Sequence, residues 1–572
     1  MSGTKFDFII IGAGGSGAVI ASILSYGGKY SVLLIEQGYN HNADPSVINA
    51  NNIPQADSKP NITDVYPTTR DPGFNFRQVQ IKQGRGWGGS TCDGYLYAAR
   101  PSQTYLQGLE TLFGPKFSLQ NSNDILRCLE NYVPQPGGII DASRGTAGPL
   151  IISQLPQGRT VFNLGSTDII SGINNQTMLS GLAFQLGQPI HTGGTGFIAT
   201  ELIPINDDYN SVFAPETNIN IREQAFVKIE GTGFIRSFNG TSYLHGGVVD
   251  QISGEGINRR LMIASGTKVL EILFEHTKTI NTSKAVGIKA LVGDECCKFV
   301  ANCGVIVCAG AIESPALLMR SGIGPLSVLK NACIYPIIIN ENVGRHLFMN
   351  VGPRWSLTSN NASYGSNPSI NGFVNIPTNS ISSVYPPPYP PSYVPQRMYQ
   401  LFVDAVPSIG ITGMSGQYDI SVPSWNVVPK SEGDISIVSK DIFTKPIINI
   451  NAYSHPDDKI LAREFSRRLA YSVDDAISNG AALAWVGPDP STLSDIALDT
   501  LIASNSTAIG GCGTCRMSSN PWNGVVDSNF RVFGTTNLYI CDMSIYPYIP
   551  DANGTLAAIL LGYKLSNQLL FL

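Results

Sequence analysis

The feature that most constrains this chain is a glycine-rich turn between two apolar runs near the N-terminus. Residues 6–11 form an apolar run interrupted only by Asp7, as expected for a buried parallel strand, and Gly12-Ala13-Gly14-Gly15-Ser16-Gly17 follows at once. A short helix-compatible segment comes next, and a second apolar run, Ser31–Ile35, ends at Glu36, 19 residues after the last glycine of the turn. A G-x-G-x-x-G between strand and helix, followed by an acid at this distance, indicates dinucleotide binding.

Each residue of this motif has a physical role in such a site. Gly12 makes the tight turn, Gly14 lets the backbone approach a pyrophosphate, and Gly17 lets the helix pack closely on the strand. The N-terminus of the helix then faces the phosphates. Glu36 accepts hydrogen bonds from ribose hydroxyls, and an acid there disfavours a 2'-phosphate, so FAD or NAD is favoured over NADP. A plain glycine-rich turn is the alternative.

Length and composition limit the classes of protein to consider. At ~150 residues per domain, 572 residues correspond to roughly two to four domains. With 43% hydrophobic and 14% charged residues, the chain can bury a large core, which excludes a disordered protein. The net charge of -5 does not indicate nucleic-acid binding, although a local basic patch stays open.

The expected location is cytoplasmic, without a membrane partner. The N-terminus has no pattern of a secretory signal, and the longest apolar runs fall short of the ~20 residues that span a bilayer. Ten cysteines in a chain of this length do not form the dense framework of a small secreted domain, so free thiols are expected.

A second glycine cluster, residues 84–89, has four glycines in six residues and excludes a strand or helix interior. It is either another turn or a place where the backbone passes close to a flat ligand. Further along, residues 219–310 are rich in strand patterns, and Val305–Ala309 is a buried run that enters a glycine turn. Near the C-terminus, a short apolar strand at Leu538–Cys541 precedes Asp542.

Four separated motifs together resemble the glucose-methanol-choline (GMC) oxidoreductases, a family of FAD-dependent alcohol oxidases and dehydrogenases. The first is the N-terminal turn with Glu36. The others are GRGWGGSTCDGYLYAARP (Gly84–Pro101), GAIESPALLMRSGIGP (Gly310–Pro325) and the closing segment from Gly513 to Asn553. The resemblance covers nearly the whole chain.

The resemblance implies an α/β fold in which a Rossmann-like FAD-binding domain is joined to a substrate domain with an antiparallel sheet. The FAD-binding domain is expected to be discontinuous, with residues 1–155, 219–330 and 505–572. The substrate domain is expected to contain residues 156–218 and 331–504.

The resemblance also implies which residues bind FAD, and no metal is expected. Residues 88–90 would pass beside the flavin or the pyrophosphate, Val269 would offer backbone to the adenine, and Asp542 would lie by the phosphates and ribityl chain. The full expected set is Gly12, Gly14, Gly17, Glu36, Arg85, Gly88, Gly89, Ser90, Asp93, Val269, Asp542 and Asn553. The chain departs from the family where only Cys92 separates Thr91 from Asp93-Gly94, so one residue is missing and an acid replaces an amide.

The catalytic segment departs further. In the enzymes that this chain resembles, a base accepts the proton of the alcohol while a hydride is transferred to the flavin. The second catalytic position of the family falls on Asn553, an accepted residue there, but the usual histidine falls on Gly510, and no histidine lies beyond His455. Either alcohol oxidation is weakened or another group replaces the histidine: a histidine from elsewhere, a tyrosine, or Cys512. Cys512 and Cys515 have the spacing of a redox-active dithiol. The alternative is that they are two buried thiols without redox activity.

The predicted function is therefore an FAD-dependent oxidoreductase acting on the CH–OH group of an alcohol, with Gly510 at the usual histidine position. The alternative is a catalytically weakened, FAD-bound fold used as a structural component. The lost histidine, the Asn-rich composition and the missing signal are similar to GMC-like proteins of large DNA viruses, which makes a virion location a second expectation. Partners would be a small alcohol or none, and a homo-oligomer or larger assembly is compatible with either function.

Overall fold

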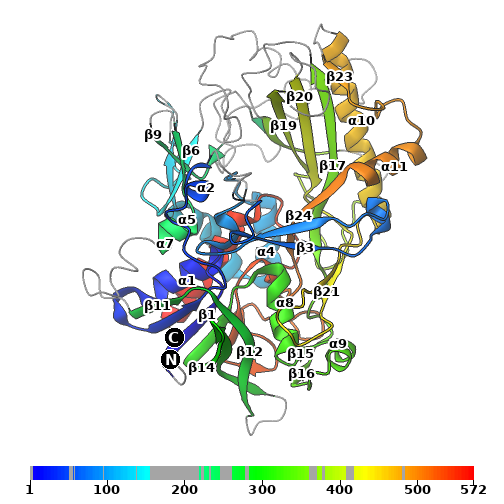
Figure 1. Ribbon diagram of the computed structural model, residues 1–572. Coiled ribbons are helices and arrows are strands. Elements are labelled where there is room, and N and C mark those ends of the chain that lie inside the picture. Colours follow the sequence, from blue (N-terminus) through cyan, green and yellow to red (C-terminus); the bar gives the residue numbers. More distant parts are fainter. Residues whose placement is uncertain are drawn as a thin grey trace.

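The computed structural model describes residues 4–50, 56, 58–94, 96–134, 136, 138, 140–154, 218–220, 224–230, 233–244, 260–276, 282–359, 370–376, 381–407, 418–478 and 483–571. These residues form two lobes, each built on its own sheet (Figure 1). Residues 156–217, most of the shorter segment expected in the substrate domain, lie outside the described residues.

The first lobe contains an eight-stranded sheet whose order is β11-β2-β1-β14-β13-β12, with β26 beside β14 and β25 beside β13. Its strands are β1 (Lys5–Ile11), β2 (Ser31–Ile35), β11 (Arg260–Ala264), β12 (Thr267–His276), β13 (Ser283–Val292), β14 (Glu295–Val307), β25 (Thr535–Thr536) and β26 (Leu538–Ile540). β11, β2, β1, β14 and β26 pair with their neighbours in parallel. β13 pairs antiparallel with both β12 and β14. The apolar runs expected as buried strands therefore form the parallel half of one sheet.

Two helices from opposite ends of the chain pack together against this sheet: α1 (Gly15–Ser25) and α12 (Gly554–Leu570). The Ser16 hydroxyl donates a hydrogen bond to the carbonyl of Ala558 at 2.7 Å. The start of α1 is also tight against β1, since a Cβ on Gly17 would lie 2.0 Å from the Gly12 carbonyl oxygen. The end of α12 lies next to the loop before β2, where Lys29 Nζ donates a hydrogen bond to the carbonyl of Leu570 at 2.6 Å.

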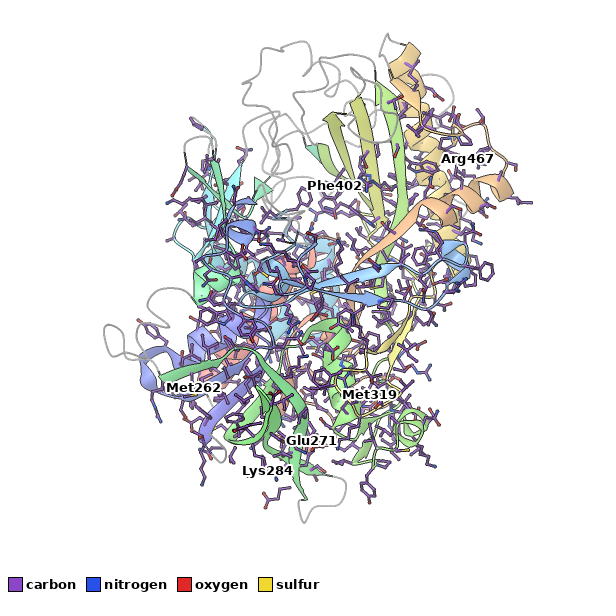
Figure 2. All side chains as sticks on the ribbon, in the orientation of Figure 1. Met262, Glu271, Lys284, Met319, Phe402 and Arg467 are labelled. Carbon is purple, nitrogen blue, oxygen red and sulfur yellow. The ribbon has the colours of Figure 1, made fainter. Side chains whose placement is uncertain are left out.

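The second lobe contains a seven-stranded, antiparallel sheet whose order is β23-β17-β20-β19-β18-β7, with β24 also beside β17. The strands are β7 (Asn218–Asn220), β17 (Phe348–Ser359), β18 (Ile370–Val374), β19 (Tyr399–Pro407), β20 (Tyr418–Asn426), β23 (Leu483–Trp485) and β24 (Ser506–Cys512). One face packs on α10 (Pro456–Ser478) and α11 (Asp495–Asn505), where Tyr399 stacks on Phe465 with ring centroids 4.4 Å apart. Figure 2 shows Arg467 of α10 on the outer side of this layer.

The expectation of a substrate domain with an antiparallel sheet thus agrees with the second lobe. The exact domain boundaries stay a prediction. β7 and β24 both pair within the second sheet, so these two short segments belong structurally with β17 and β18.

Residues 40–80, which the polar sequence suggests to be largely irregular, contain a short helix, α2 (Pro45–Ile48), and an antiparallel ribbon of β3 (Thr63–Pro67) and β4 (Gln80–Gly84). The ribbon runs between the two lobes (Figure 1). Its bend is held by buried Asp71, whose carboxylate accepts hydrogen bonds from the backbone of Gly73 and, in the second lobe, of Ala452, both at 2.8 Å. Contacts between distant segments, which the local sequence does not reveal, order this region.

The remaining described elements are short. They are α4 (Gln103–Phe113), α5 (Leu119–Leu129), α7 (Asn239–Tyr243), α8 (Gly310–Arg320), α9 (Leu326–Asn331), β5 (Glu130–Val133), β6 (Leu150–Gln154), β8 (Gln224–Ala225), β9 (Val227–Glu230), β10 (Gly233–Arg236), β15 (Ile323–Gly324), β16 (Ile338–Ile339), β21 (Asp434–Ser436) and β22 (Ile447–Asn449). Among the described residues, none of the helices is both long and apolar enough to cross a membrane.

A buried ionic cluster surrounds Glu130 at the start of β5. Its carboxylate accepts hydrogen bonds from Arg100, from Arg144 Nε at 2.8 Å and Nη2 at 3.0 Å, and from the backbone N–H of Gly145 at 2.9 Å. All three charged side chains are at most 5% exposed. One carboxylate therefore serves two buried guanidinium groups.

A pair of lysines, of which Lys564 is buried and Lys116 half-buried, links α12 to the segment after α4. Lys564 Nζ donates to the carbonyl of Lys116 at 2.9 Å and to Asn121 Oδ1 at 2.6 Å. Burial and the neighbouring Lys116 lower the pKa of Lys564 from 10.5 to about 7, and burial lowers the pKa of Lys116 to about 8. Both ammonium groups are therefore costly to keep charged in the folded protein.

This lysine makes stability depend on pH. Because the folded pKa of Lys564 lies below the unfolded value, its cost is full below about pH 7 and is relieved as pH rises towards 10.5. The free energy of unfolding of the wild-type protein minus that of Lys564→Met is expected to grow between pH 7 and 9, by at most about 1.4 kcal/mol per unit. Urea denaturation at several pH values measures it, with exposed Lys330→Met as the control, and a flat or falling difference would contradict it.

Candidate cofactor and catalytic site

Glu36, at the end of β2, holds together the two glycine-rich turns that the sequence singles out. Its carboxylate is buried and accepts hydrogen bonds from the backbone of Ala13 at 2.9 Å, Gly38 at 2.8 Å and Gly86 at 3.1 Å. Burial raises the pKa of Glu36, while these three donors and nearby Arg85 favour the ionised form. The acid that was expected at a ribose therefore lies where residues 12–17 and 84–89 meet.

The two turns touch backbone to backbone. A Cβ on Gly89 would lie 2.8 Å from the Gly14 Cα, and a Cβ on Gly12 would lie 2.4 Å from the Cys308 carbonyl oxygen. Above Gly14 itself there is open space, since a Cβ there meets nothing nearer than 4.0 Å. Side chains larger than hydrogen would therefore block the approach of a flat ligand or a pyrophosphate to this surface.

The helices beside this surface offer free backbone donors. Neither α1 nor α12 has a side-chain cap at its N-terminus, and neither has an acidic residue in its first turn. Their first N–H groups and the positive end of each helix dipole suit an anion. FAD supplies such an anion in its pyrophosphate, so the missing caps fit the cofactor implied by the family resemblance.

A pocket next to these helix ends contains unpaired polar atoms. It is lined by Ser90 and Thr91 from the second turn, Asn239 from α7, Thr555 from α12 and Arg236 from β10. Asn239 donates to the carbonyl of Gly15 at 2.7 Å, but its Oδ1 and the Nη2 of Arg236 are buried without a partner among the described residues. Burial lowers the pKa of Arg236 to about 10. Orphaned polar groups of this kind indicate a polar ligand, and together with the uncapped helices they fit FAD.

Other residues expected to bind FAD are engaged with the backbone of neighbouring segments. Asp542 accepts from the Gly310 backbone at 2.9 Å and from Ser314 Oγ at 2.5 Å, so it anchors the start of α8. Ser90 Oγ accepts from the Gly84 backbone at 2.9 Å, and this closes the second turn. Val269 lies on β12 opposite Ala290. These residues shape the site through the backbone.

Asp93, the acid in place of the family amide, interacts with a hydroxyl group and with a cationic side chain. It accepts a hydrogen bond from Thr63 Oγ1 at 2.6 Å, and its charge favours the cationic form of Arg236. Arg85 places its Nη1 3.6 Å from Asp64. Cys92, between Thr91 and Asp93, is buried in an apolar cluster that includes Phe238, and burial raises the pKa of its thiol well above the usual range. It is therefore a small core residue in this structure.

At the catalytic end, Gly510 opens onto a gap. It lies on β24 with φ +72°, and the nearest atoms to a Cβ there are Asn350 Nδ2 at 3.8 Å and Ile549 Cδ1 at 3.9 Å. Asn553 is the N-cap residue of α12 but does not cap it with its side chain. Instead Asn553 Oδ1 accepts from Gln400 Nε2 at 3.2 Å, so the amide is held by the sheet of the second lobe.

The face of that sheet turned towards Asn553 carries residues that sequence reasoning missed. Trp425 pairs with Gln400, and opposite residues of antiparallel strands share a face. Phe402, two residues after Gln400, lies on the same face and stacks on Tyr97 of the first lobe at 4.2 Å. Figure 2 shows Phe402 where the sheet approaches the first lobe. An aromatic wall therefore stands beside the two amides.

No described histidine lies within 4 Å of a Cβ on Gly510, where the usual histidine of the family is missing. His41 bonds the carbonyl of Asn61 at 3.1 Å, and His346 lies 2.6 Å from Glu432, so both are engaged elsewhere. Within 4 Å of a Cβ on Gly510 the described residues provide only an amide and an isoleucine. His191 and His245 lie outside the described residues.

The cysteine and tyrosine alternatives are also poor bases. Cys512 and Cys515 are fully buried free thiols, and burial raises the pKa of each well above the usual range. The pKa values of the neighbouring Tyr105, Tyr389 and Tyr546 are raised by burial in the same way. A protonated thiol is a weak nucleophile, so the structure gives the redox-dithiol hypothesis no support. No cluster of three or more potential metal ligands occurs among the described residues.

Glu36 offers a test of the cofactor surface. Replacing it with Ala leaves the backbone donors of Ala13, Gly38 and Gly86 without their acceptor and loosens both turns. Since hydrogen bonds to a charged group contribute about 1.5–3 kcal/mol, FAD affinity is expected to fall at least tenfold. Fluorescence titration of the apoprotein with FAD measures this, with exposed Glu230→Ala as the control, and unchanged affinity would contradict it.

Comparisons with known proteins agree with this arrangement. The two models of the GMC oxidoreductases match residues 248–351 and 429–562. The oxygen-dependent choline dehydrogenase of Photobacterium profundum is 25% identical, with 99% of this chain and 93% of the relative covered. The 5-(hydroxymethyl)furfural oxidase of a Methylovorus species is 24% identical, with 100% and 99% covered.

Solved structures share the fold from end to end. Pyridoxine 4-oxidase, from an organism given as Mesorbium loti, has a TM-score of 0.76 at 21% identity and covers 99% of both chains. Formate oxidase has a TM-score of 0.78 at 20% identity, with 99% of this chain and 98% of the other covered. The two family models match in order along the chain, and the relatives match it over almost its full length. The chain is therefore similar to the GMC oxidoreductase family along nearly its whole length.

Proposed function

We propose that this chain is an FAD-dependent oxidoreductase that acts on the CH–OH group of an alcohol without the histidine usual in its family. The observation that carries the proposal is the meeting of Asn553 with the aromatic sheet face beside the gap at Gly510. Bound FAD would supply the hydride acceptor. The oxygen-dependent choline dehydrogenase, the furfural oxidase and the fungal aryl-alcohol oxidase among the similar proteins support an alcohol as the substrate class.

The residues of the chain would divide the work. Glu36, the uncapped ends of α1 and α12, and the pocket beside Arg236 would hold FAD. Asn553, fixed by Gln400, would orient the substrate hydroxyl and donate a hydrogen bond as negative charge develops on its oxygen. Tyr97 and Phe402 would exclude water from one side.

The missing base sets the expected rate. A positioned base contributes about 10²–10⁴-fold, and Gly510 cannot supply one. Alcohol oxidation by the wild-type protein is therefore expected to be slow, below the ~1–10³ s⁻¹ of ordinary enzymes. The oxidation should become faster at alkaline pH, where hydroxide can remove the proton of the alcohol.

The test is anaerobic flavin reduction in the purified yellow protein. Benzyl alcohol, choline and short aliphatic alcohols would be mixed with it at pH 7 and pH 10, and the loss of oxidised-flavin absorbance followed. Slow reduction that accelerates with pH supports the proposal. A colourless protein, or one whose flavin no alcohol reduces at either pH, would reject it.

One observation favours a second candidate, in which the fold is kept mainly for assembly. No proton-accepting side chain among the described residues lies within 4 Å of a Cβ on Gly510. A structural component, as in a virion, would tolerate this loss. Light scattering after size-exclusion chromatography distinguishes the two candidates. Inactive protein in large ordered assemblies favours the second candidate. A monomer or small oligomer that oxidises alcohols excludes it.

A further inference from the structure

Asn350 is the nearest polar side chain to the gap at Gly510. It lies on β17, where it pairs with Ile509 of β24, and its Nδ2 is 3.8 Å from the position of a Cβ on Gly510. The residue is 6% exposed. Its amide therefore borders the space that a side chain at position 510 would fill.

The amide of Asn350 is not used by the protein itself. Its Oδ1 is buried without a hydrogen-bond partner among the described residues. A buried, unpaired carbonyl oxygen costs about 1–3 kcal/mol, so such groups are rare unless something else pairs with them. In contrast, buried Asn340 and Asn426 bond with both ends of their amides.

The register of the sheet places Asn350 on the same face as the residues already described. Arg354 pairs with Pro423, so Gly352 stands opposite Trp425, and a Cβ on Gly352 would indeed lie 2.8 Å from the Trp425 Cα. Since side chains alternate along a strand, Asn350, Trp425 and Gln400 share one face. Gln400 in turn bonds Asn553 at 3.2 Å.

We propose that Asn350 binds the substrate hydroxyl from the side left empty by Gly510, as a further catalytic residue. The inference rests on the proposed function and adds a second amide to it. Asn350 Oδ1 accepts the hydrogen bond of the hydroxyl, while Asn553, the amide of the proposed function, is held by Gln400 on the same sheet face. An amide holds a hydroxyl in position but does not remove its proton, which agrees with slow oxidation at neutral pH.

Binding can be tested apart from turnover with a tertiary alcohol, because its carbinol carbon has no hydride to give. 2-Phenyl-2-propanol would be titrated into the holoprotein and followed by tryptophan fluorescence and by the flavin spectrum. Asn350→Leu keeps the approximate size and removes the amide, and is expected to weaken binding about tenfold. Met349→Leu, on the same strand but pointing into the core, is the matched control and should change the dissociation constant less than twofold.

A second variant gives a different readout. Asn350→Asp puts a carboxylate at the edge of the gap, where it can accept the proton, so flavin reduction by benzyl alcohol should become faster than in the wild type. Its rate should rise and then level off as pH passes the pKa of the new carboxylate, whereas the wild-type rate should continue to rise with pH.

The outcomes separate the inference from the proposed function. If the wild-type protein reduces its flavin with alcohols but Asn350→Leu binds the tertiary alcohol as tightly as the wild type, the inference is wrong and the function stands. If no alcohol reduces the flavin but binding still depends on Asn350, the function is wrong and the binding site stands. No measurable binding to the wild-type protein also overturns the inference.

Discussion

Gly510→His is expected to raise the rate of flavin reduction by alcohols about 10²–10⁴-fold, the usual contribution of a positioned base. The structure has room for the change, because none of the described residues apart from its two chain neighbours lies nearer than 3.8 Å to a Cβ at this position. The backbone is less favourable: at φ +72° a side chain costs about 1–2 kcal/mol, although histidine is one of the residues found more often in this conformation. The imidazole acts when neutral, so the gain should appear as pH rises through about 6.5.

The matched control is Gly510→Ala, which carries the same backbone cost without a base. Stopped-flow reduction of all three proteins, at equal FAD content and between pH 5 and pH 9, separates catalysis from stability. Equal rates in the His and Ala variants would show that the gap does not face the reacting hydroxyl. Added imidazole offers an independent check, since it should accelerate the wild-type protein more than Gly510→His.

Glu130→Ala is expected to lower the free energy of unfolding of the first lobe by about 3–5 kcal/mol. The variant leaves the guanidinium groups of Arg100 and Arg144 buried without their carboxylate and removes the acceptor of the Gly145 backbone. The cost comes from the stranded charges more than from the lost attraction, because charged groups at most 5% exposed cannot recover their hydration.

The control for this variant is Glu230→Ala, which removes an ion pair with Lys228 whose side chains are 49% and 55% exposed. Such exposed pairs contribute little, so a change below about 0.5 kcal/mol is expected. Urea denaturation followed by circular dichroism compares the two. A midpoint for Glu130→Ala equal to that of Glu230→Ala would mean that water reaches the cluster.

The parallel half of the first sheet could be predicted because its strands are buried on both faces. Such strands are mostly apolar, and the runs at residues 6–11 and 31–35 became β1 and β2 within one residue. The antiparallel sheet could not be predicted strand by strand. β17 contains Gly352 and Pro353 in its middle, which locally favour a break, and only pairing with β20 and β24 makes it a strand.

The candidate site divides in the same way. The turns at residues 12–17 and 84–89 have compositions that permit few other structures, and the family motif located Gly510 and Asn553. Asn350 and Gln400 could not be found from the sequence, because their importance depends on strand register and on the absence of a hydrogen-bond partner. The pairing of Glu130 with two arginines likewise has no local signature.

The order of strands in the first sheet also governs when this protein can fold during its synthesis. β1 pairs with β14, and β14 pairs with β26. The centre of the sheet therefore joins three segments that are far apart in the sequence and are synthesised at different times. α1 likewise waits for α12 to cover it. An emerging chain on the ribosome must therefore keep the apolar strands β1 and β2 soluble until β26 and α12 have been made, which makes chaperone binding and translation rate determinants of yield.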